Sequence, residues 1–197
     1  MSSAHTMRVI GGSFKGRVIP FEKKLKGAEA TSQRLKKALF SILGEDLTGK
    51  NFLDLYSGTG QIGLEALSRG ASLVVFNDSD RNRYQFVKDI VHTWELSGRV
   101  LHYNIDALRC IKICSERGVV FDVVFCDPPF EKIADIPRVY ATLLQAISAS
   151  AIINEESVIL VQHYHTNTMP DTIGRLHKKD TRKYGTNSLS IYVVKAE

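Results

Sequence analysis

The segment NFLDLYSGTGQIGLEALSRGASLVVFN, residues 51–77, predicts the fold of this chain more directly than any other. It has the pattern of a buried strand, a glycine-rich turn, a helix over Ile62–Ser68 and a second buried strand. Elements in this order form a parallel strand pair joined by a right-handed crossover. The turn contains Gly58 and Gly60, which would let a ligand approach the backbone closely.

The same alternation of strands and helices continues along the chain. Strands are expected at VLHYN, FDVVFC and SVILVQHY, and helices over Asp80–Glu95, Ala107–Glu116 and Ile136–Ser148. The last two strand-like runs, RLHKKDTRKY and SLSIYVVK, follow each other without a helix and predict an antiparallel pair at the sheet edge. We therefore predict an α/β, Rossmann-like fold with a mostly parallel sheet of seven strands.

The composition is that of a globular protein, with 197 residues, 44% hydrophobic and 24% charged. No apolar run approaches membrane-spanning length, and the N-terminus lacks a secretory pattern, so we expect a cytoplasmic protein without a membrane partner. Cys110, Cys114 and Cys126 lack metal-ligand companions in the sequence. We expect them to be buried, reduced thiols and expect no metal site.

The N-terminal part of the chain carries the excess positive charge. Residues 1–37 contain nine basic and two acidic residues, whereas the whole chain has a net charge of +5. The run RVIGGSFKGRVIP predicts a basic β-hairpin, and we place a hairpin extension at residues 1–30 and the main domain at 31–197. Arg8, Lys15 and Arg17 are candidate contacts to nucleic-acid phosphates, although a solvated basic surface without a partner remains the alternative.

The run TSQRLKKALFSIL, residues 31–43, predicts an amphipathic helix. Thr31 or Ser32 would cap its N-terminus. Arg34 then lies in the first turn, where the helix dipole disfavours a cation. This arginine either binds a phosphate or a substrate carboxylate, or simply faces solvent.

Acidic residues end three successive predicted strands, at Asp54, Asp78 and Asp106. Ligands of open α/β sheets bind beyond these carboxyl ends. A carboxylate at Asp54 would repel a pyrophosphate but attract the ammonium and sulfonium groups of S-adenosylmethionine. Asp78 would then bind the ribose diol and Asp106 the adenine amino group, unless Asp78 and Asp106, like Asp80, only cap the helices that follow them.

The glycine spacing also permits a different cofactor. Gly58, Gly60 and Gly63 match the G-x-G-x-x-G pattern, and Asp78 lies near the distance along the chain at which dinucleotide enzymes carry an acidic residue. An NAD-dependent oxidoreductase is therefore an alternative hypothesis.

The segment FDVVFCDPPF ends a predicted strand with a carboxylate and two prolines. The prolines cannot lie inside the strand, and they restrict Asp127 and Pro128 to extended backbone. The Asp127 carboxylate and the Pro128 carbonyl could accept both hydrogens of an exocyclic amine on a nucleobase, while Phe130 stacks on the base. Alternatively, Asp127 caps a turn and Phe130 fills the core.

With these features the chain resembles class I S-adenosylmethionine-dependent methyltransferases, and among them the RsmD-type 16S rRNA guanine-N2 methyltransferases. The similarity covers nearly the whole chain through the segments RVIGGSFKGRVIP, TSQRLKKALFSIL, DLYSGTGQIGLEALSRGA, FDVVFCDPPF and RKYGTNSLSIY. It implies methyl transfer from S-adenosylmethionine to N2 of a guanine in 16S rRNA, with S-adenosylhomocysteine as product. The implied substrate is a small-subunit assembly intermediate, and we expect a monomer.

The resemblance also implies roles for individual residues. Catalysis is expected at Asp127, Pro128, Pro129 and Phe130, and substrate binding at Thr31, Ser32 and Arg34 beside the hairpin cations. Expected cofactor contacts are Asp54, Tyr56, Gly58, Gly60, Asp78, Ser79, Asp106, Ala107 and Asp127. The chain departs from the family pattern at Glu29, Ala30, Lys37 and Gln162. Methylation of another nucleobase amine, in other rRNA or in DNA, and a catalytically silent assembly factor remain alternatives.

Overall fold

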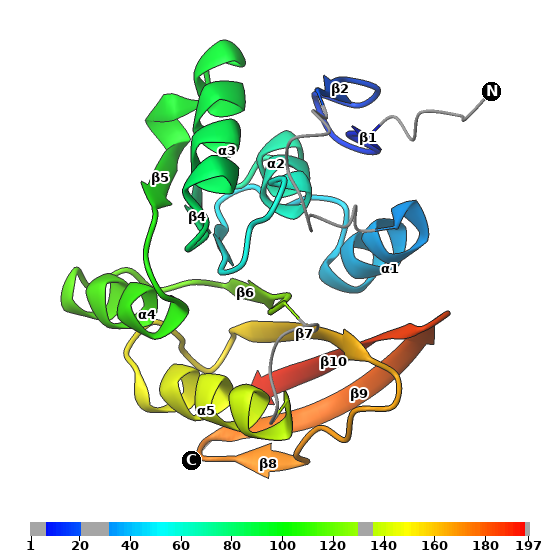
Figure 1. Ribbon diagram of the computed structural model, residues 1–197, viewed down its shortest axis with the longest axis vertical. Coiled ribbons are helices and arrows are strands. Elements are labelled where there is room, and N and C mark those ends of the chain that lie inside the picture. The colour runs from blue at the N-terminus through cyan, green and yellow to red at the C-terminus, as the bar shows by residue number, and fades with distance from the viewer. Residues whose placement is uncertain (1–6, 21–31, 130–135, 196–197) are drawn as a thin grey trace.

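The computed structural model describes residues 7–20, 32–129 and 136–195 (Figure 1). Its helices are α1 (Gln33–Leu43), α2 (Gln61–Ser68), α3 (Arg81–Thr93), α4 (Ala107–Glu116) and α5 (Ile136–Ala149), with a short 3-10 helix at Ser97–Arg99. Its strands are β1 (Met7–Arg8), β2 (Val18–Ile19), β3 (Asn51–Asp54), β4 (Leu73–Asn77), β5 (Val100–Tyr103), β6 (Val123–Cys126), β7 (Val158–Tyr164), β8 (Thr172–Ile173), β9 (Leu176–Tyr184) and β10 (Asn187–Val194). This order confirms the predicted alternation.

Within the described ranges, the main sheet has eight strands in the order β5-β4-β3-β6-β7-β10-β9-β8. The five strands β5, β4, β3, β6 and β7 pair in parallel. Strands β10, β9 and β8 complete the sheet at one edge in antiparallel pairs. The prediction of seven strands missed β8, which pairs with β9 across a turn at Gly174 with φ 54°. A strand of two residues is too short to show an alternating pattern in the sequence.

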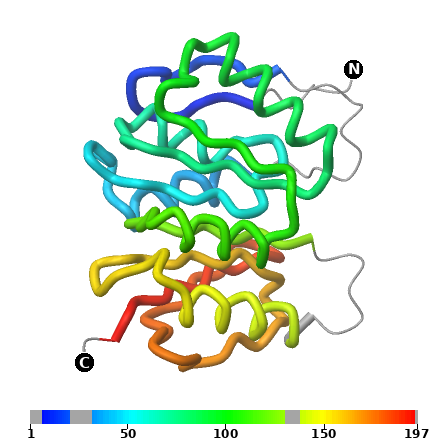
Figure 2. Tube along the Cα trace, turned by 90° about the vertical axis from the view of Figure 1, so that its left-hand side faces the viewer, coloured from blue at the N-terminus to red at the C-terminus, as the bar shows by residue number. Residues whose placement is uncertain are grey.

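Helices cover both faces of the sheet, as Figure 1 and Figure 2 show. On one face α1, α2 and α3 form a core cluster with strand residues such as Phe52 and Phe125. On the other face α4 and α5 form a second cluster with strand residues such as Leu53 and Val124. Successive residues of the central strands therefore enter opposite cores, which explains why these strands are apolar throughout.

The order of strands reverses at β3. The chain passes outward from β3 to β4 and β5, and then returns to β6 on the other side of β3. The carboxyl ends of β3 and β6 consequently lie side by side, with Asp54 in register with Phe125. The fold thus brings Asp54 and Asp127 to the point of the sheet edge where open α/β proteins bind ligands.

The β1–β2 hairpin docks on the C-terminal end of α2. The Ser13 N–H donates to the Ser68 carbonyl oxygen at 2.7 Å. Glycines allow this approach, because a Cβ at Gly11 would overlap the Arg69 guanidinium and a Cβ at Gly12 would overlap the Ser68 carbonyl. The two glycines and the end of α2 are therefore complementary parts of one contact.

Substitution of Gly12 by alanine is expected to destabilise this contact. Gly12 and Gly16 both have positive φ, 71° and 88°, but a Cβ at Gly16 has nothing within 4 Å. We expect Gly12→Ala to lower the free energy of unfolding by about 2–4 kcal/mol and Gly16→Ala by only about 1–2 kcal/mol. Urea unfolding of the two variants measures the difference, and equal losses would contradict the close approach to Ser68.

A buried cluster of charges links the hairpin to α1 and α2. Lys36, fully buried in α1, donates to the Arg8 carbonyl oxygen at 2.7 Å and to Glu65 Oε1 at 3.2 Å. The same Glu65 oxygen accepts from the Ile10 N–H at 2.6 Å, while Arg69 pairs with the other oxygen. Burial lowers the pKa of Lys36, and Glu65 opposes that shift. Lys36, which we counted in the basic N-terminal region, is therefore an internal structural cation.

Cys110, Cys114 and Cys126 are free and buried, which confirms the predicted state of these thiols. Among the residues that the structure describes, no three His, Cys, Asp or Glu side chains are grouped so that they could hold a metal ion. No helix in the same part of the chain is long and apolar enough to cross a membrane.

Candidate active site

Asp54 ends β3 as a buried carboxylate at the glycine-rich turn. Its Oδ2 accepts a hydrogen bond from the Gly63 N–H at 3.0 Å, which ties the strand to the first turns of α2. Burial raises the pKa of Asp54 to about 7, with a further contribution from the charge of Asp78. An acid with this pKa next to an open turn is suited to a cationic ligand, which would favour its ionised form.

Asp78 follows β4 and connects it to the same turn. Its Oδ2 accepts from the Gly58 N–H at 2.9 Å and its Oδ1 from the Asp80 N–H at 2.9 Å. Burial raises the pKa of Asp78. Asp78 and Asp54 thus lie on two sides of the glycine turn, whereas Ser79 is exposed beside them.

The glycines of the turn have two different tasks. A Cβ at Gly63 would overlap the Phe76 ring, and a Cβ at Gly60 would contact Val87, so these two glycines allow α2 to pack closely. A Cβ at Gly58 would meet nothing within 4 Å. The open space over Gly58, whose N–H donates to the buried Asp78, lets a ligand approach the turn closely.

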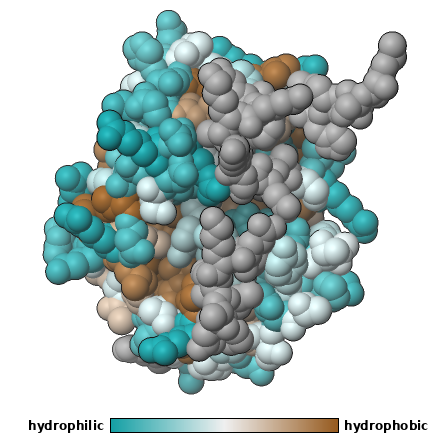
Figure 3. Space-filling view, viewed as in Figure 1, coloured by the Kyte–Doolittle hydropathy of each residue, from teal (hydrophilic) through white to brown (hydrophobic). Residues whose placement is uncertain are grey.

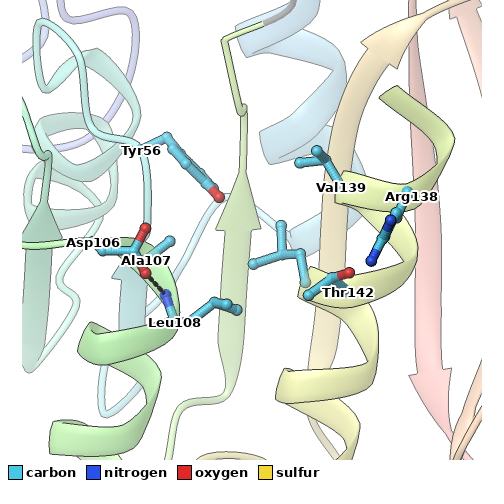
Figure 4. Close-up of a pocket in the computed structure, with 8 residues that line it drawn as sticks. Tyr56, Asp106, Ala107, Leu108, Arg138, Val139 and Thr142 are labelled. Carbon is cyan, nitrogen blue, oxygen red and sulfur yellow. Dashed lines mark hydrogen bonds between the residues drawn. The ribbon is translucent and has the colours of Figure 1, made fainter. Parts of the chain in front are cut away.

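A cavity of about 310 Å³ opens beyond the carboxyl ends of the strands, between α4 and α5 (Figure 4). Figure 4 shows Tyr56 and Asp106 on one side and Val139 and Thr142 of α5 on the other. Apolar surface also gathers on the α4 and α5 side of the face drawn in Figure 3. The lining residues are Tyr56, Asp106, Ala107, Leu108, Arg138, Val139, Thr142 and Leu143. Apolar walls with a few polar groups suit a flat heterocycle.

The sequence predicted only part of this lining. Tyr56, Asp106 and Ala107 were expected to contact the cofactor, and the structure brings them together at the cavity. The residues from α5 were missed, because an amphipathic pattern shows that a helix has an apolar face but not that this face borders a cavity.

The capping alternatives for two aspartates are confirmed. Asp106 accepts from the Leu108 N–H at 2.8 Å as the N-cap of α4, and Asp80 accepts from the Asn82 N–H at 2.8 Å as the N-cap of α3. Asp106 also lines the cavity, so its two predicted positions are compatible.

Asp127 directly follows β6, next to the buried thiol of Cys126. Burial raises the pKa of that thiol, and the charges of Asp54 and Asp127 add to the effect. Pro128 is buried and Pro129 is exposed. Phe130 and Thr31, two further predicted site residues, lie outside the described residues.

The family model described as Conserved hypothetical protein 95, which represents the RsmD family, matches residues 7–193. The chain belongs to the RsmD family of S-adenosylmethionine-dependent methyltransferases. Family membership confirms the predicted family, enzyme class and cofactor, and it removes the support for the NAD-dependent alternative.

Relatives of the RsmD family match most of this chain. The protein YlbH of Bacillus subtilis (strain 168) is 32% identical over 188 residues, covering 94% of this chain and 98% of its own. An Escherichia coli (strain K12) protein named Ribosomal RNA small subunit methyltransferase D is 26% identical over 170 residues, covering 86% of this chain and 80% of its own.

Solved structures support the same fold. The Escherichia coli protein yhhF has a TM-score of 0.81 at 23% identity, covering 98% of this chain and 99% of its own. An RNA methyltransferase from Salinibacter ruber, in complex with S-adenosyl-L-homocysteine, has a TM-score of 0.63 at 14% identity, covering 86% of this chain and 95% of its own. At these identities the likeness concerns the fold, which is the predicted Rossmann-like one.

The family's arginine-containing helix begins as predicted. Ser32 is the N-cap of α1, and its hydroxyl accepts from the Leu35 N–H at 3.2 Å. Arg34 lies exposed in the first turn, which contains no acidic residue. The helix N-terminus and this guanidinium together form a positive end of α1.

The three predicted hairpin cations of this RsmD-family chain are exposed. Arg8 donates through Nη1 to the Gly16 carbonyl at 3.1 Å, and the Arg17 guanidinium lies 4.4 Å from the centroid of the Trp94 ring. Stacking on Trp94 holds Arg17 at a defined position while its N–H groups remain accessible. Lys15 extends this positive surface.

Proposed function

We propose that this chain transfers a methyl group from S-adenosylmethionine to the exocyclic N2 of a guanine in 16S rRNA. The observation that carries the proposal is the position of Asp127 directly after β6, whose Phe125 pairs with Asp54 of β3 at the strand-order reversal. The name of the Escherichia coli relative, which refers to ribosomal RNA of the small subunit, supports this choice of substrate.

The residues around the glycine turn fit the cofactor's chemistry. We propose that Asp54 binds its cationic methionine end, Asp78 and Ser79 its ribose, and Tyr56, Asp106 and Ala107 its adenine. Gly58, where a Cβ would have nothing within 4 Å, would leave room for the cofactor beside the turn, and Gly60 would shape the turn through its close packing on Val87. When bound, S-adenosylmethionine supplies an electrophilic methyl group on a sulfonium.

Asp127 and Pro128 would orient the acceptor amine. The lone pair of an exocyclic amine is delocalised into the base, so the free amine is a poor nucleophile. Two acceptors, the Asp127 carboxylate and the Pro128 carbonyl, would bind its two hydrogens and direct the lone pair toward the donor. Asp127 can then accept the proton that the methylated nitrogen loses. Phe130 would stack on the base, and Pro129 would stiffen the segment.

Cofactor binding is expected to depend on pH through Asp54. In the free protein this carboxyl has a pKa of about 7, so it is largely protonated below that pH. Binding of a cation requires the ionised form, so affinity should rise by up to about tenfold per pH unit below pH 7 and then level off. Calorimetry between pH 5.5 and 8 measures this, and Asp54→Asn should remove the slope.

The same group sets an opposite trend in the stability of the free protein. Because the pKa of Asp54 is raised above its unfolded value of 3.8, the folded state holds more protons between about pH 4 and 7. The Asp54 contribution should therefore make the free energy of unfolding fall as pH rises through this window. A contribution that rises over the same range would contradict the buried, protonated carboxyl.

The positive hairpin and the N-terminus of α1 would bind RNA phosphates. An unpaired or extruded guanine is required, because a paired base cannot enter a pocket. If Arg8, Lys15 and Arg17 each contact one phosphate, replacing all three by alanine should reduce the slope of log affinity against log salt by about 2. A matched variant with alanine at Lys112, Lys179 and Lys195 removes the same charge elsewhere and should retain the slope. Equal slopes in both variants would rule out this surface.

Analysis of labelled nucleosides tests the reaction itself. Small-subunit rRNA is incubated with the protein and S-adenosylmethionine labelled in its methyl group, then digested to nucleosides. The proposal predicts label in N2-methylguanosine. Label in a methylated adenosine or cytidine would instead support another nucleobase amine, and no transfer to RNA would contradict the proposal.

A further inference from the structure

Gln162 is a buried polar residue near the end of β7, with only 5% of its surface exposed. Its Oε1 accepts no hydrogen bond from any side chain or backbone group in the described part of the chain. Buried side-chain oxygens in folded proteins nearly always have a donor, and leaving one without a donor destabilises the protein. Other buried side chains, such as Asn77 and His102, also have an atom without a partner among the described residues, but Gln162 lies near the carboxyl edge of the sheet, so a ligand there could supply its donor.

The register of the sheet places this amide beside the proposed catalytic carboxylate. Cys126 of β6 pairs with Val161 of β7, so Asp127 and Gln162 are the next residues on neighbouring parallel strands. Strand β6 ends here at the carboxyl edge, where ligands of open α/β sheets bind, and β7 continues to Tyr164.

Side-chain alternation places Gln162 on the same face as Asp127. Leu160 belongs to the core cluster on the α1 to α3 side, whereas Val161 belongs to the opposite cluster, so Gln162 returns to the first side. In β6, Phe125 likewise belongs to the cluster on the α1 to α3 side and Cys126 to the opposite cluster. Because Pro128 keeps Asp127 extended, the alternation continues and returns Asp127 to the α1 to α3 side.

The strand on the other side of β7 supplies no partner for the amide oxygen. Gln162 pairs there with Leu189 of β10, whose side chain is buried and apolar. An apolar residue would pack at position 162 without leaving an unsatisfied oxygen, so packing alone does not account for the glutamine.

We propose that Gln162 is a specificity-determining residue that accepts a hydrogen bond from N1–H of the target guanine. This inference rests on the proposed function and extends it from the amine to the neighbouring ring nitrogen. Guanine presents two kinds of donor side by side, the N2 amine and N1–H. Adenine and cytosine instead present an acceptor nitrogen next to their amine, so Gln162 disfavours both bases when its amide oxygen, and not its NH2 group, faces the base.

2-Aminopurine isolates this contact, because it keeps the 2-amino group but has no hydrogen on N1. The experiment compares kcat/KM for an RNA containing the target guanine, located by mass mapping of methylated rRNA fragments, with the same RNA containing 2-aminopurine there. Three proteins are compared: the wild type, Gln162→Met, which is similar in size but has no acceptor oxygen, and Gln145→Met, a matched change at an exposed glutamine of α5.

The wild type and Gln145→Met are expected to prefer guanine by about tenfold, the value of one hydrogen bond. Gln162→Met should lose about tenfold for guanine and little for 2-aminopurine, so its preference should fall to about one. The melting temperature of Gln162→Met should be equal to or above that of the wild type, which shows that the variant is folded.

Two results would overturn the inference while leaving the proposed function intact. One is an unchanged preference for guanine in Gln162→Met. The other is that the wild type and Gln162→Met both methylate the guanine RNA and both fail to methylate the 2-aminopurine RNA. Absence of guanine methylation by the wild type is distinguishable from both, and it would overturn the proposed function together with this inference.

Discussion

Asp127→Asn is expected to lower kcat/KM by about 10²–10⁴-fold, the range found when a positioned base is removed. Asparagine keeps the size of the side chain but replaces one acceptor oxygen by a donor and removes the negative charge. The amine would lose an oriented acceptor and the reaction its proton acceptor. Steady-state kinetics with labelled methyl donor measure this loss, and calorimetry shows how far cofactor binding contributes to it.

Asp122→Asn provides the matched control for this variant. Asp122 precedes the same strand, β6, at its amino end, where it accepts from the Asn51 N–H at 2.8 Å and pairs with Lys50. The same chemical change there should leave kcat/KM within about twofold of the wild-type value, since surface ion pairs contribute little. Comparable losses in the two variants would mean that Asp127 acts through the fold and not through the amine.

Glu65→Gln is expected to produce the largest loss of stability. Glu65 and Lys36 are both fully shielded from solvent, and Arg69 is nearly so. Removing the negative charge leaves Lys36 without a charged partner and leaves Arg69 only the exposed Glu45, and breaking a buried pair typically costs about 3–5 kcal/mol. Chemical unfolding measures this loss, and Glu116→Gln, which breaks an exposed pair with Lys112 on α4, serves as the control.

The Glu65 variant should also loosen the hairpin. The Glu65 carboxylate accepts from the Ile10 N–H, and its partner Lys36 donates to the Arg8 carbonyl oxygen, so both contacts to the hairpin depend on one charge. Proteolysis of the folded protein should therefore cut the hairpin region faster in Glu65→Gln than in Glu116→Gln. Equal stability of the two variants would contradict the account of a buried charge cluster.

The alternating part of the fold was predictable because its signals are local. Apolar strands that end in Asp54, Asp78 and Asp127, with helices between them, show their period and their ends within short windows. Because ligands of open α/β sheets bind at the carboxyl ends of the strands, the same pattern also predicts that these three carboxylates share one edge of the sheet.

What the sequence did not predict depends on contacts between distant segments. Lys36 has the sequence context of a solvated lysine, and only the approach of α2 with Glu65 shows that it is internal. Gly11 and Gly12 lie in the run that predicts a hairpin, and their close contact with the end of α2 does not follow from that pattern. The role of Gln162 as a buried acceptor likewise depends on the register between β6 and β7.

A crystal structure with S-adenosylhomocysteine bound tests the central claim most directly. The account predicts the product's sulfur between the turn at Gly58–Gly60 and the Asp127 carboxylate, with its adenine in the cavity lined by Tyr56 and Asp106. An amine held by Asp127 would then lie about 3–3.5 Å from the position of the methyl group. An Asp127 side chain directed away from this crevice, or a ligand bound elsewhere, would contradict the account.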